Sequence, residues 1–147
     1  MKRILPPTYL LLAIAAMVGL HFLLPGAKLV AWPWGLLGIA PFTAGVVVDM
    51  IADRAFKIHG TTVKPFEESS ALLTDGVYGF TRHPMYLGFV LILLGIAVFM
   101  GSATPFAVIA AFAVLMDVVF IRAEERMMEA KFGERWATYT SRTRRWM

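Results

Sequence analysis

The stretch GVYGFTRHPMYLG, residues Gly76–Gly88, decides the predicted fold. Pro84 has no backbone N–H and is best tolerated in the first turn of a helix, so it predicts that the apolar run after it becomes helical there. His83, directly before the proline, is pushed towards an extended conformation. Arg82 and His83 would then lie beside the unpaired N–H groups of a helix start, where the macrodipole favours negative charge. This arrangement predicts an anion site.

The composition predicts an integral membrane protein. Hydrophobic residues make up 59% of the 147 residues, charged residues make up 16%, and the mean hydropathy is +0.68. The chain has no cysteine, which excludes disulfides, thiolate metal sites and cysteine nucleophiles. The net charge of +4 is better explained by membrane topology than by a nucleic-acid partner, so we expect no nucleic acid.

Four apolar runs predict an all-α protein, a single domain over residues 1–147 with about four transmembrane helices. The runs cover residues 8–24, 35–51, 85–100 and 105–121, each at the short end for a spanning helix. The first run resembles a signal peptide, with Lys2 and Arg3 before its apolar core. No small-residue cleavage site follows Leu24, so we expect this segment to be retained.

The basic residues predict the orientation. Thirteen of the fourteen Lys and Arg residues fall on one side of the four predicted spans, and Lys28 is the exception. Cationic loops stay in the cytoplasm, so we expect both termini, the loop 57–83 and the tail 122–147 to be cytoplasmic, in a prokaryotic inner membrane. All plausible chemistry then lies on the cytoplasmic face.

The tail is predicted to be helical in two pieces. RAEERMMEAKF continues the fourth span as a helix, and Gly133 is placed to end it. An amphipathic piece follows, whose residues Arg142, Arg144 and Arg145 suit an anionic membrane surface.

Two features of this sequence leave alternatives open. Gly88 permits close approach of a ligand, but Gly88 and Gly95 are seven residues apart on one helix face, which also favours helix packing. Glu124 and Glu125 diverge by about 100° on a helix, so one is expected to bind a ligand while the other pairs with a cation such as Arg82. Alternatively, both acids are solvated charges on a surface helix and have no further role.

Other polar residues give weaker signals. Asp49, Asp53 and Asp117 lie at or near the cytoplasmic ends of spans, where we expect them to reach water or pair with Arg54. The three histidines are scattered and no close carboxylate set accompanies them, so we expect no metal site.

Four segments, TTVKPFEES (Thr61–Ser69), LLTDGVYGFTRHPMYLG (Leu72–Gly88), EER (Glu124–Arg126) and KFGERWATYTSRTRRW (Lys131–Trp146), resemble the isoprenylcysteine carboxyl methyltransferase family and its phospholipid methyltransferase relatives. The shared signature is an RHPxYxG turn, then a Glu-Glu pair, then a tail that contains tyrosine. The resemblance covers most of the chain after Lys57, whereas the first two spans carry no signature.

The resemblance implies S-adenosyl-L-methionine as cofactor, bound between the cytoplasmic ends of the last two spans and a tail that closes the pocket. It implies that the cofactor is bound by His83, Tyr86, Gly88, Glu124 and Glu125. Arg82 and Glu125 are the candidate catalytic residues. Arg82 is expected either to orient an anionic acceptor, which we favour slightly, or to pair with an acid of the tail.

The resemblance leaves the acceptor open. Family members that methylate prenylated cysteine have a Val-Pro-rich end and more spans, whereas this chain ends TRRWM (Thr143–Met147). We expect a lipophilic or membrane-associated thiol, carboxylate, amine or hydroxyl as acceptor, with membrane lipids as partners. The alternatives are an NADPH-dependent membrane reductase of the sterol-reductase type and a small membrane protein without catalytic activity.

Overall fold

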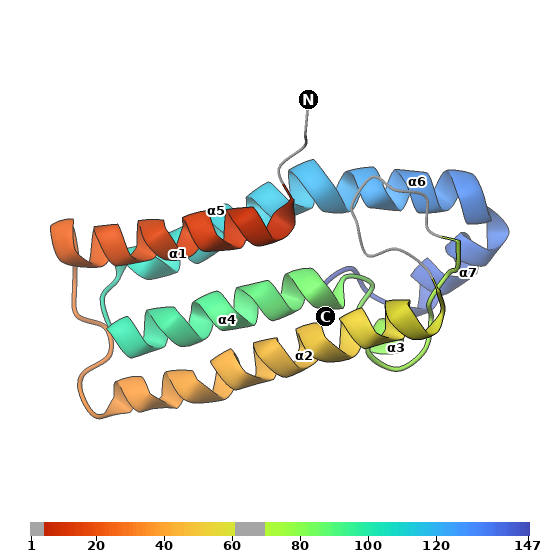
Figure 1. Ribbon diagram of the computed structural model, residues 1–147. Helices are drawn as coiled ribbons and strands as arrows, with labels where there is room; N and C mark the ends of the chain where they lie inside the picture. Colours follow the sequence, from red (N-terminus) through yellow and green to blue (C-terminus); the bar gives the residue numbers. More distant parts are fainter. Residues whose placement is uncertain (1–4, 61–69) are drawn as a thin grey trace.

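The computed structural model describes residues 5–60 and 70–147, whose named elements are all helical, as predicted for an all-α protein. Figure 1 shows the helices side by side, with one end of the bundle carrying the C-terminal region. The elements are α1 (Pro6–Leu23), η1 (Trp34–Gly38), α2 (Ile39–Ile58), α3 (Val77–Phe80), α4 (Pro84–Met100), α5 (Thr104–Met116), η2 (Asp117–Ile121), α6 (Arg122–Phe132) and α7 (Glu134–Arg142). The segment Thr61–Ser69, part of the family resemblance, lies outside the described residues.

Three helical stretches are long and apolar enough to cross a membrane: Pro6–Leu23, Trp34–Ile58 and Thr104–Phe132. The remaining predicted span, the third (residues 85–100), corresponds to α4, which is apolar but shorter, with 17 residues. The four predicted runs are therefore all helical, and their composition is that of an integral membrane protein.

The second helix extends beyond its predicted end, whereas the fourth continues into the tail as predicted. The second continues to Ile58 instead of ending at residue 51, and an ion pair between Asp53 and Lys57, one turn apart, supports its polar last turns. The fourth continues without a break through a π-helical turn, Asp117–Ile121, into α6. Gly133, with φ +49°, separates α6 from α7 as the sequence predicted.

The two short connections of the bundle meet at one end (Figure 1). Gly101 ends α4 in a left-handed conformation, and its carbonyl accepts hydrogen bonds from the backbone N–H groups of Leu29 and Val30, at 2.7 and 3.0 Å. Ala103 donates to the carbonyl of Pro25 at 3.1 Å. The start of α4, the end of α2 and all of α6 and α7 therefore lie at the opposite end.

Glycines hold α2 and α4 together, backbone against backbone. A Cβ atom on Gly45 would lie 2.5 Å from the carbonyl oxygen of Gly88, and one on Gly95 would lie 2.5 Å from that of Gly38. The glycines are seven residues apart on each side, so they face one another in an antiparallel register. We call these four residues the glycine seam. Helix packing, one of the two predicted roles for Gly88 and Gly95, is confirmed by these contacts.

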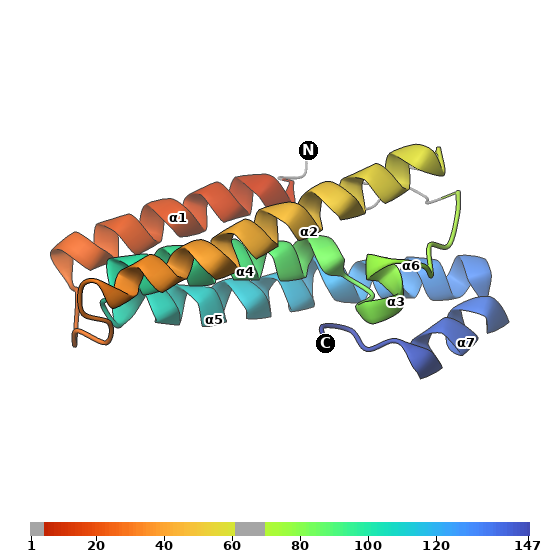
Figure 2. The same cartoon turned by 90° about the horizontal axis from the view of Figure 1, so that it is seen from below.

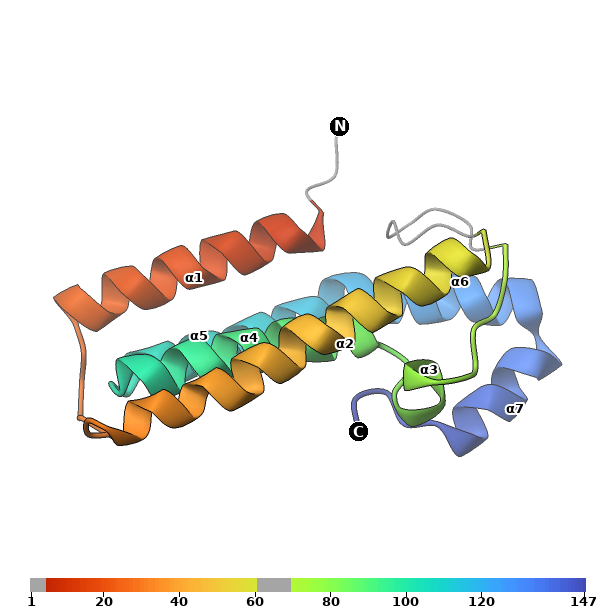
Figure 3. The same ribbon diagram turned by 60° about the horizontal axis from the view of Figure 1, so that its bottom comes forward.

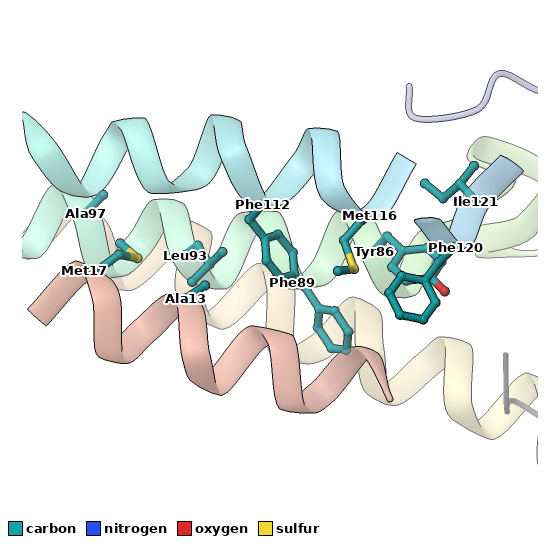
Figure 4. Packing of buried hydrophobic residues seen from close by; sticks show 10 residues of the cluster. All are labelled: Ala13, Met17, Tyr86, Phe89, Leu93, Ala97, Phe112, Met116, Phe120 and Ile121. Carbon is teal, nitrogen blue, oxygen red and sulfur yellow. The ribbon is translucent and has the colours of Figure 1, made fainter. Parts of the chain in front are cut away.

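The main core lies between α1, α4 and α5 (Figure 4). Met17, Leu93 and Met116 are fully buried there. At the end of this core that leads to the polar region, the rings of Tyr86 and Phe120 pack with their centroids 6.3 Å apart. This packing holds the Tyr86 side chain in one place while its hydroxyl reaches beyond the apolar core.

The C-terminal segment folds back onto the turn before α4 (Figures 2 and 3). Thr81 and Arg144 form an isolated parallel bridge, in which the backbone N–H of Arg82 donates to the carbonyl of Arg144 at 3.0 Å. The Tyr139 hydroxyl donates to the carbonyl of Tyr78 at 2.5 Å. Backbone and side-chain bonds thus fix the tail beside residues 78–82.

Candidate functional site

The RHP sequence places two basic side chains at the start of α4. Pro84 occupies the first turn of this helix, as predicted, while His83 before it, with φ −128° and ψ 61°, lies outside the extended region. The Thr81 hydroxyl accepts a hydrogen bond from the backbone N–H of His83 at 3.3 Å. This local geometry turns Arg82 and His83 towards the acids of α6.

Glu125 is surrounded by three basic side chains. Its Oε1 accepts hydrogen bonds from Arg82 Nε and Nη2, at 3.1 and 2.9 Å. Its Oε2 accepts one from Arg145 Nη2 at 2.5 Å, and His83 Nε2 lies 3.3 Å from Oε1. Only 14% of the Glu125 side chain is exposed, so these charge-assisted bonds lie in a partly dry environment, where they are strong.

The third guanidinium nitrogen of Arg82, Nη1, donates hydrogen bonds to the backbone of the tail. It donates to the carbonyl oxygens of Thr143 and Thr140, at 2.7 and 3.4 Å. With Nε and Nη2 on Glu125, every nitrogen of the guanidinium has a partner within the chain. This geometry favours the predicted alternative in which Arg82 pairs with an acid of the tail.

Glu124 has a different surrounding. Its Oε1 accepts a hydrogen bond from the Tyr86 hydroxyl at 2.6 Å, and His83 Nδ1 lies 3.6 Å from Oε2. Its side chain is more exposed than that of Glu125, 24% against 14%. The two glutamates diverge around the helix, so His83 stands between them and contacts both.

The surroundings of His83 decide its charge. Burial disfavours the protonated imidazole, but hydrogen bonds to Glu124 and Glu125 and the charges of these carboxylates outweigh burial and raise the pKa of His83. When the ring is protonated, it bridges the two acids. The anion site expected at the start of α4 stays a prediction.

Gly88 does not lie in this cluster. It belongs to the glycine seam, and a Cβ atom there would overlap Oδ1 of Asp49 on α2. The structure therefore brings together Arg82, His83, Tyr86, Glu124 and Glu125, and it places Gly88 on the opposite side of α4.

Sequence reasoning missed the inward role of Arg145, which was assigned to the membrane surface. Arg145 binds both Glu125 and Asp117, and Asp117 also accepts a hydrogen bond from Arg122 at 2.9 Å. Asp117 was expected to reach water or to pair with Arg54, whereas its observed partners are Arg122 and Arg145. One basic residue among several in the tail carries no signal in the sequence that separates it from its neighbours.

A cavity of about 330 Å³ lies between α6 and α7. It is lined by charges of both signs and one aromatic ring: Arg122, Glu125, Arg126, Glu129, Trp136, Ala137, Thr140 and Arg145. The cluster at the start of α4 shares Glu125 and Arg145 with this cavity. In the described part of the chain, no group of three or more His, Asp or Glu side chains is arranged to hold a metal ion.

The fold and this site define a helical membrane protein with a buried charge cluster at one end. The family model described as phospholipid methyltransferase matches residues 34–135, which is more than half of the chain. The chain belongs to the phospholipid methyltransferase family. Membership implies a membrane methyltransferase, and the matched region contains His83, Tyr86 and both glutamates.

Two relatives share this similarity over shorter regions. The cobalt-zinc-cadmium resistance protein CzcN of Cupriavidus metallidurans is 36% identical over 76 residues, which is 52% of this chain and 35% of that protein. The chain thus spans about a third of the length of this relative. An uncharacterized protein of Haemophilus influenzae is 32% identical over 63 residues, which is 43% of this chain and all of that protein.

Proposed function

We propose that this protein transfers a methyl group from S-adenosylmethionine to a lipophilic or membrane-associated acceptor. The proposal rests on one observation. Residues 82–86 and 124–125, both within the region that matches the family, contact each other in one cluster at the end of the bundle. A non-catalytic protein does not need this partly buried set of five polar groups, and the family match favours methyl transfer over a reductase.

The chemistry of these residues fits the cofactor. Glu124 has a partly exposed carboxylate, which suits the α-amine or the ribose hydroxyls. In the cavity between α6 and α7, arginine side chains suit a carboxylate, and the face of Trp136 suits a cation or a flat ring. We therefore propose that Glu124 binds the cofactor directly, and that His83, Tyr86 and Glu125 hold its surroundings in position.

When bound, the cofactor supplies an activated methyl group on a sulfonium. The chain's task is then to align the acceptor with that methyl group and to exclude water, because the displacement is in line and requires no covalent enzyme intermediate. The rings of Tyr86 and Phe120 close the apolar side of the cluster. Arg82 and Arg145 tie the tail to Glu125 and so close its polar side. Catalytic roles for Arg82 and Glu125 stay predictions.

Cofactor binding is the direct test of this function. Purified protein in a neutral detergent should bind S-adenosylhomocysteine in a calorimetric titration, whereas NADPH should give no heat of binding. Removing one charge-assisted contact costs about 1.5–3 kcal/mol, so Glu124→Ala should weaken binding by about ten-fold to a hundred-fold. Glu134→Ala, an exposed acid of α7, is the control and should bind as wild type does. Unchanged affinity in Glu124→Ala would contradict direct binding of the cofactor by Glu124.

We also propose that the site faces the cytoplasm, because thirteen of the fourteen Lys and Arg residues fall on one side of the four predicted spans in the sequence. Reporter fusions after Lys57 and after Met147 should both give cytoplasmic signals. An external signal from either fusion would contradict this orientation.

A further inference from the structure

Asp117 is an acid at the end of α5 to which the proposed function gives no role. Its Oδ1 accepts a hydrogen bond from Arg145 Nη1 at 3.2 Å, and its Oδ2 accepts one from Arg122 Nε at 2.9 Å. Only 18% of the Asp117 side chain is exposed. A carboxylate withdrawn from water beside an apolar helix is costly unless it is paired, and one of its two partners, Arg145, belongs to the candidate site.

Arg145 is shared between Asp117 and Glu125. Its Nε and Nη2 donate to Oε1 and Oε2 of Glu125, at 3.2 and 2.5 Å, and its Nη1 donates to Asp117. Every nitrogen of the planar guanidinium therefore has a carboxylate partner, which fixes the orientation of the plane. Because 37% of the Arg145 side chain is exposed, against 12% for Arg82, these bonds rather than close packing hold it in place.

The π-helical turn allows one guanidinium to reach both acids. Residues of an α-helix advance by about 100° each, so two acids eight positions apart, as Asp117 and Glu125 are, would point about 80° apart around the axis. In η2, however, the backbone N–H of Arg122 donates to the carbonyl of Asp117, five residues earlier. Such a turn takes up one extra residue. The two acids are then related as residues seven positions apart, within about 20° of the same face.

The position of the Arg145 side chain matters to the candidate site in two ways. It binds both oxygens of Glu125, and it forms part of the wall of the cavity between α6 and α7. A long, partly exposed side chain has several rotamers of similar energy, and each bond to a fixed partner reduces that freedom. Asp117 supplies such a partner from the membrane-spanning part of the helix.

We propose that Asp117 is a positioning residue of the candidate site. It acts through Arg145, which it holds in the orientation that binds Glu125 and forms the cavity wall, and it makes no contact with the ligand itself. The inference rests on the proposed function for the identity of the cofactor. The bonds that join Asp117, Arg145 and Glu125 do not depend on that function.

Calorimetric titration with S-adenosylhomocysteine, well below the melting temperature, tests this role. Asp117→Ala should weaken binding by about three-fold to ten-fold, the effect of one hydrogen bond lost from the support of the site. Arg145→Ala should weaken binding further, because it removes the contacts with both acids. In the Arg145→Ala background, Asp117→Ala should have no additional effect, since Asp117 acts only through Arg145.

This dependence on Arg145 separates positioning from a general structural role. If Asp117 only stabilised its own helix, its removal would weaken binding equally in both backgrounds, and that result would overturn the proposal. So would wild-type affinity in Asp117→Ala. Asp117→Asn keeps the shape of the side chain and is the second variant, for which we expect a smaller loss with the same dependence on Arg145. Asp53→Asn removes an acid that pairs with Lys57 on α2, and this control should bind as wild type does.

Limited proteolysis of residues 133–147 in the same variants distinguishes this proposal from the proposed function. Asp117→Ala should speed cleavage of the tail in the wild-type background and should not speed it further in Arg145→Ala. Failure of wild type to bind S-adenosylhomocysteine would contradict the proposed function, while this cleavage pattern would still support positioning by Asp117. Wild-type binding and cleavage in Asp117→Ala would overturn the positioning role alone.

Discussion

Glu125→Ala is expected to lower the free energy of unfolding by about 3–5 kcal/mol, because it leaves buried cations without their partner. Arg82, His83 and Arg145 all contact this carboxylate, and the side chains of Arg82 and His83 are only 12% and 8% exposed. The tail should also detach from the start of α4, since Arg82 joins Glu125 to the carbonyls of Thr143 and Thr140. Unfolding in mixed detergent micelles, followed by circular dichroism, measures the loss.

Proteolysis gives a second measurement of the same variant. Cleavage within residues 133–147 should be faster in Glu125→Ala than in wild type, because the tail loses its attachment. Glu134→Ala removes an exposed acid from α7 and should change both measurements little. Wild-type stability in Glu125→Ala would show that the cluster does not hold the tail.

Gly45→Ala is expected to destabilise the bundle by about 1–3 kcal/mol, although alanine is the better helix former by about 1 kcal/mol. The added methyl group would lie 2.5 Å from the carbonyl oxygen of Gly88 and 2.9 Å from Ile92. Both neighbours include backbone atoms of α4, so the helices must separate to accommodate it. The melting temperature in detergent, compared with that of wild type, measures the effect.

Gly19→Ala is the matched control. Gly19 lies inside α1, and a Cβ atom there meets no other atom within 4 Å. This substitution should leave stability unchanged or raise it by up to about 1 kcal/mol through helix propensity alone. An equal loss of stability in both variants would mean that the glycine seam is not the cause.

The sequence predicts the helices of this protein well because apolar composition and proline positions are local signals. Pro84 marks the start of α4 and Gly133 separates the two helices of the tail, as expected. The extension of α2 from residue 51 to Ile58 was not predicted. The last turns of this helix are polar, and they depend on contacts such as the ion pair between Asp53 and Lys57. The π-helical turn Asp117–Ile121 has no signal in an apolar run.

The site is predicted less completely, because its contacts cross long distances in the sequence. The expectation that one of the two glutamates pairs with Arg82 agrees with the observed contact of Glu125, whereas the expectation that the other binds a ligand stays a prediction. Arg145 was missed, since which of several tail arginines turns inward depends on the fold. Gly88 has two plausible roles in sequence, and only the packed helices show that its open side faces Asp49.

The glycine seam also limits how a lipophilic ligand reaches the protein interior. Along the stretch between the contact of Gly38 with Gly95 and that of Gly45 with Gly88, the two helix backbones touch. A hydrocarbon chain has no room to pass sideways from the bilayer between α2 and α4 there. The glycine seam therefore blocks entry between α2 and α4, and Asp49, one turn beyond Gly45 on α2, also contacts Gly88. A lipophilic ligand can therefore enter from the bilayer only between helices that are separated by side chains, because side chains can change rotamer.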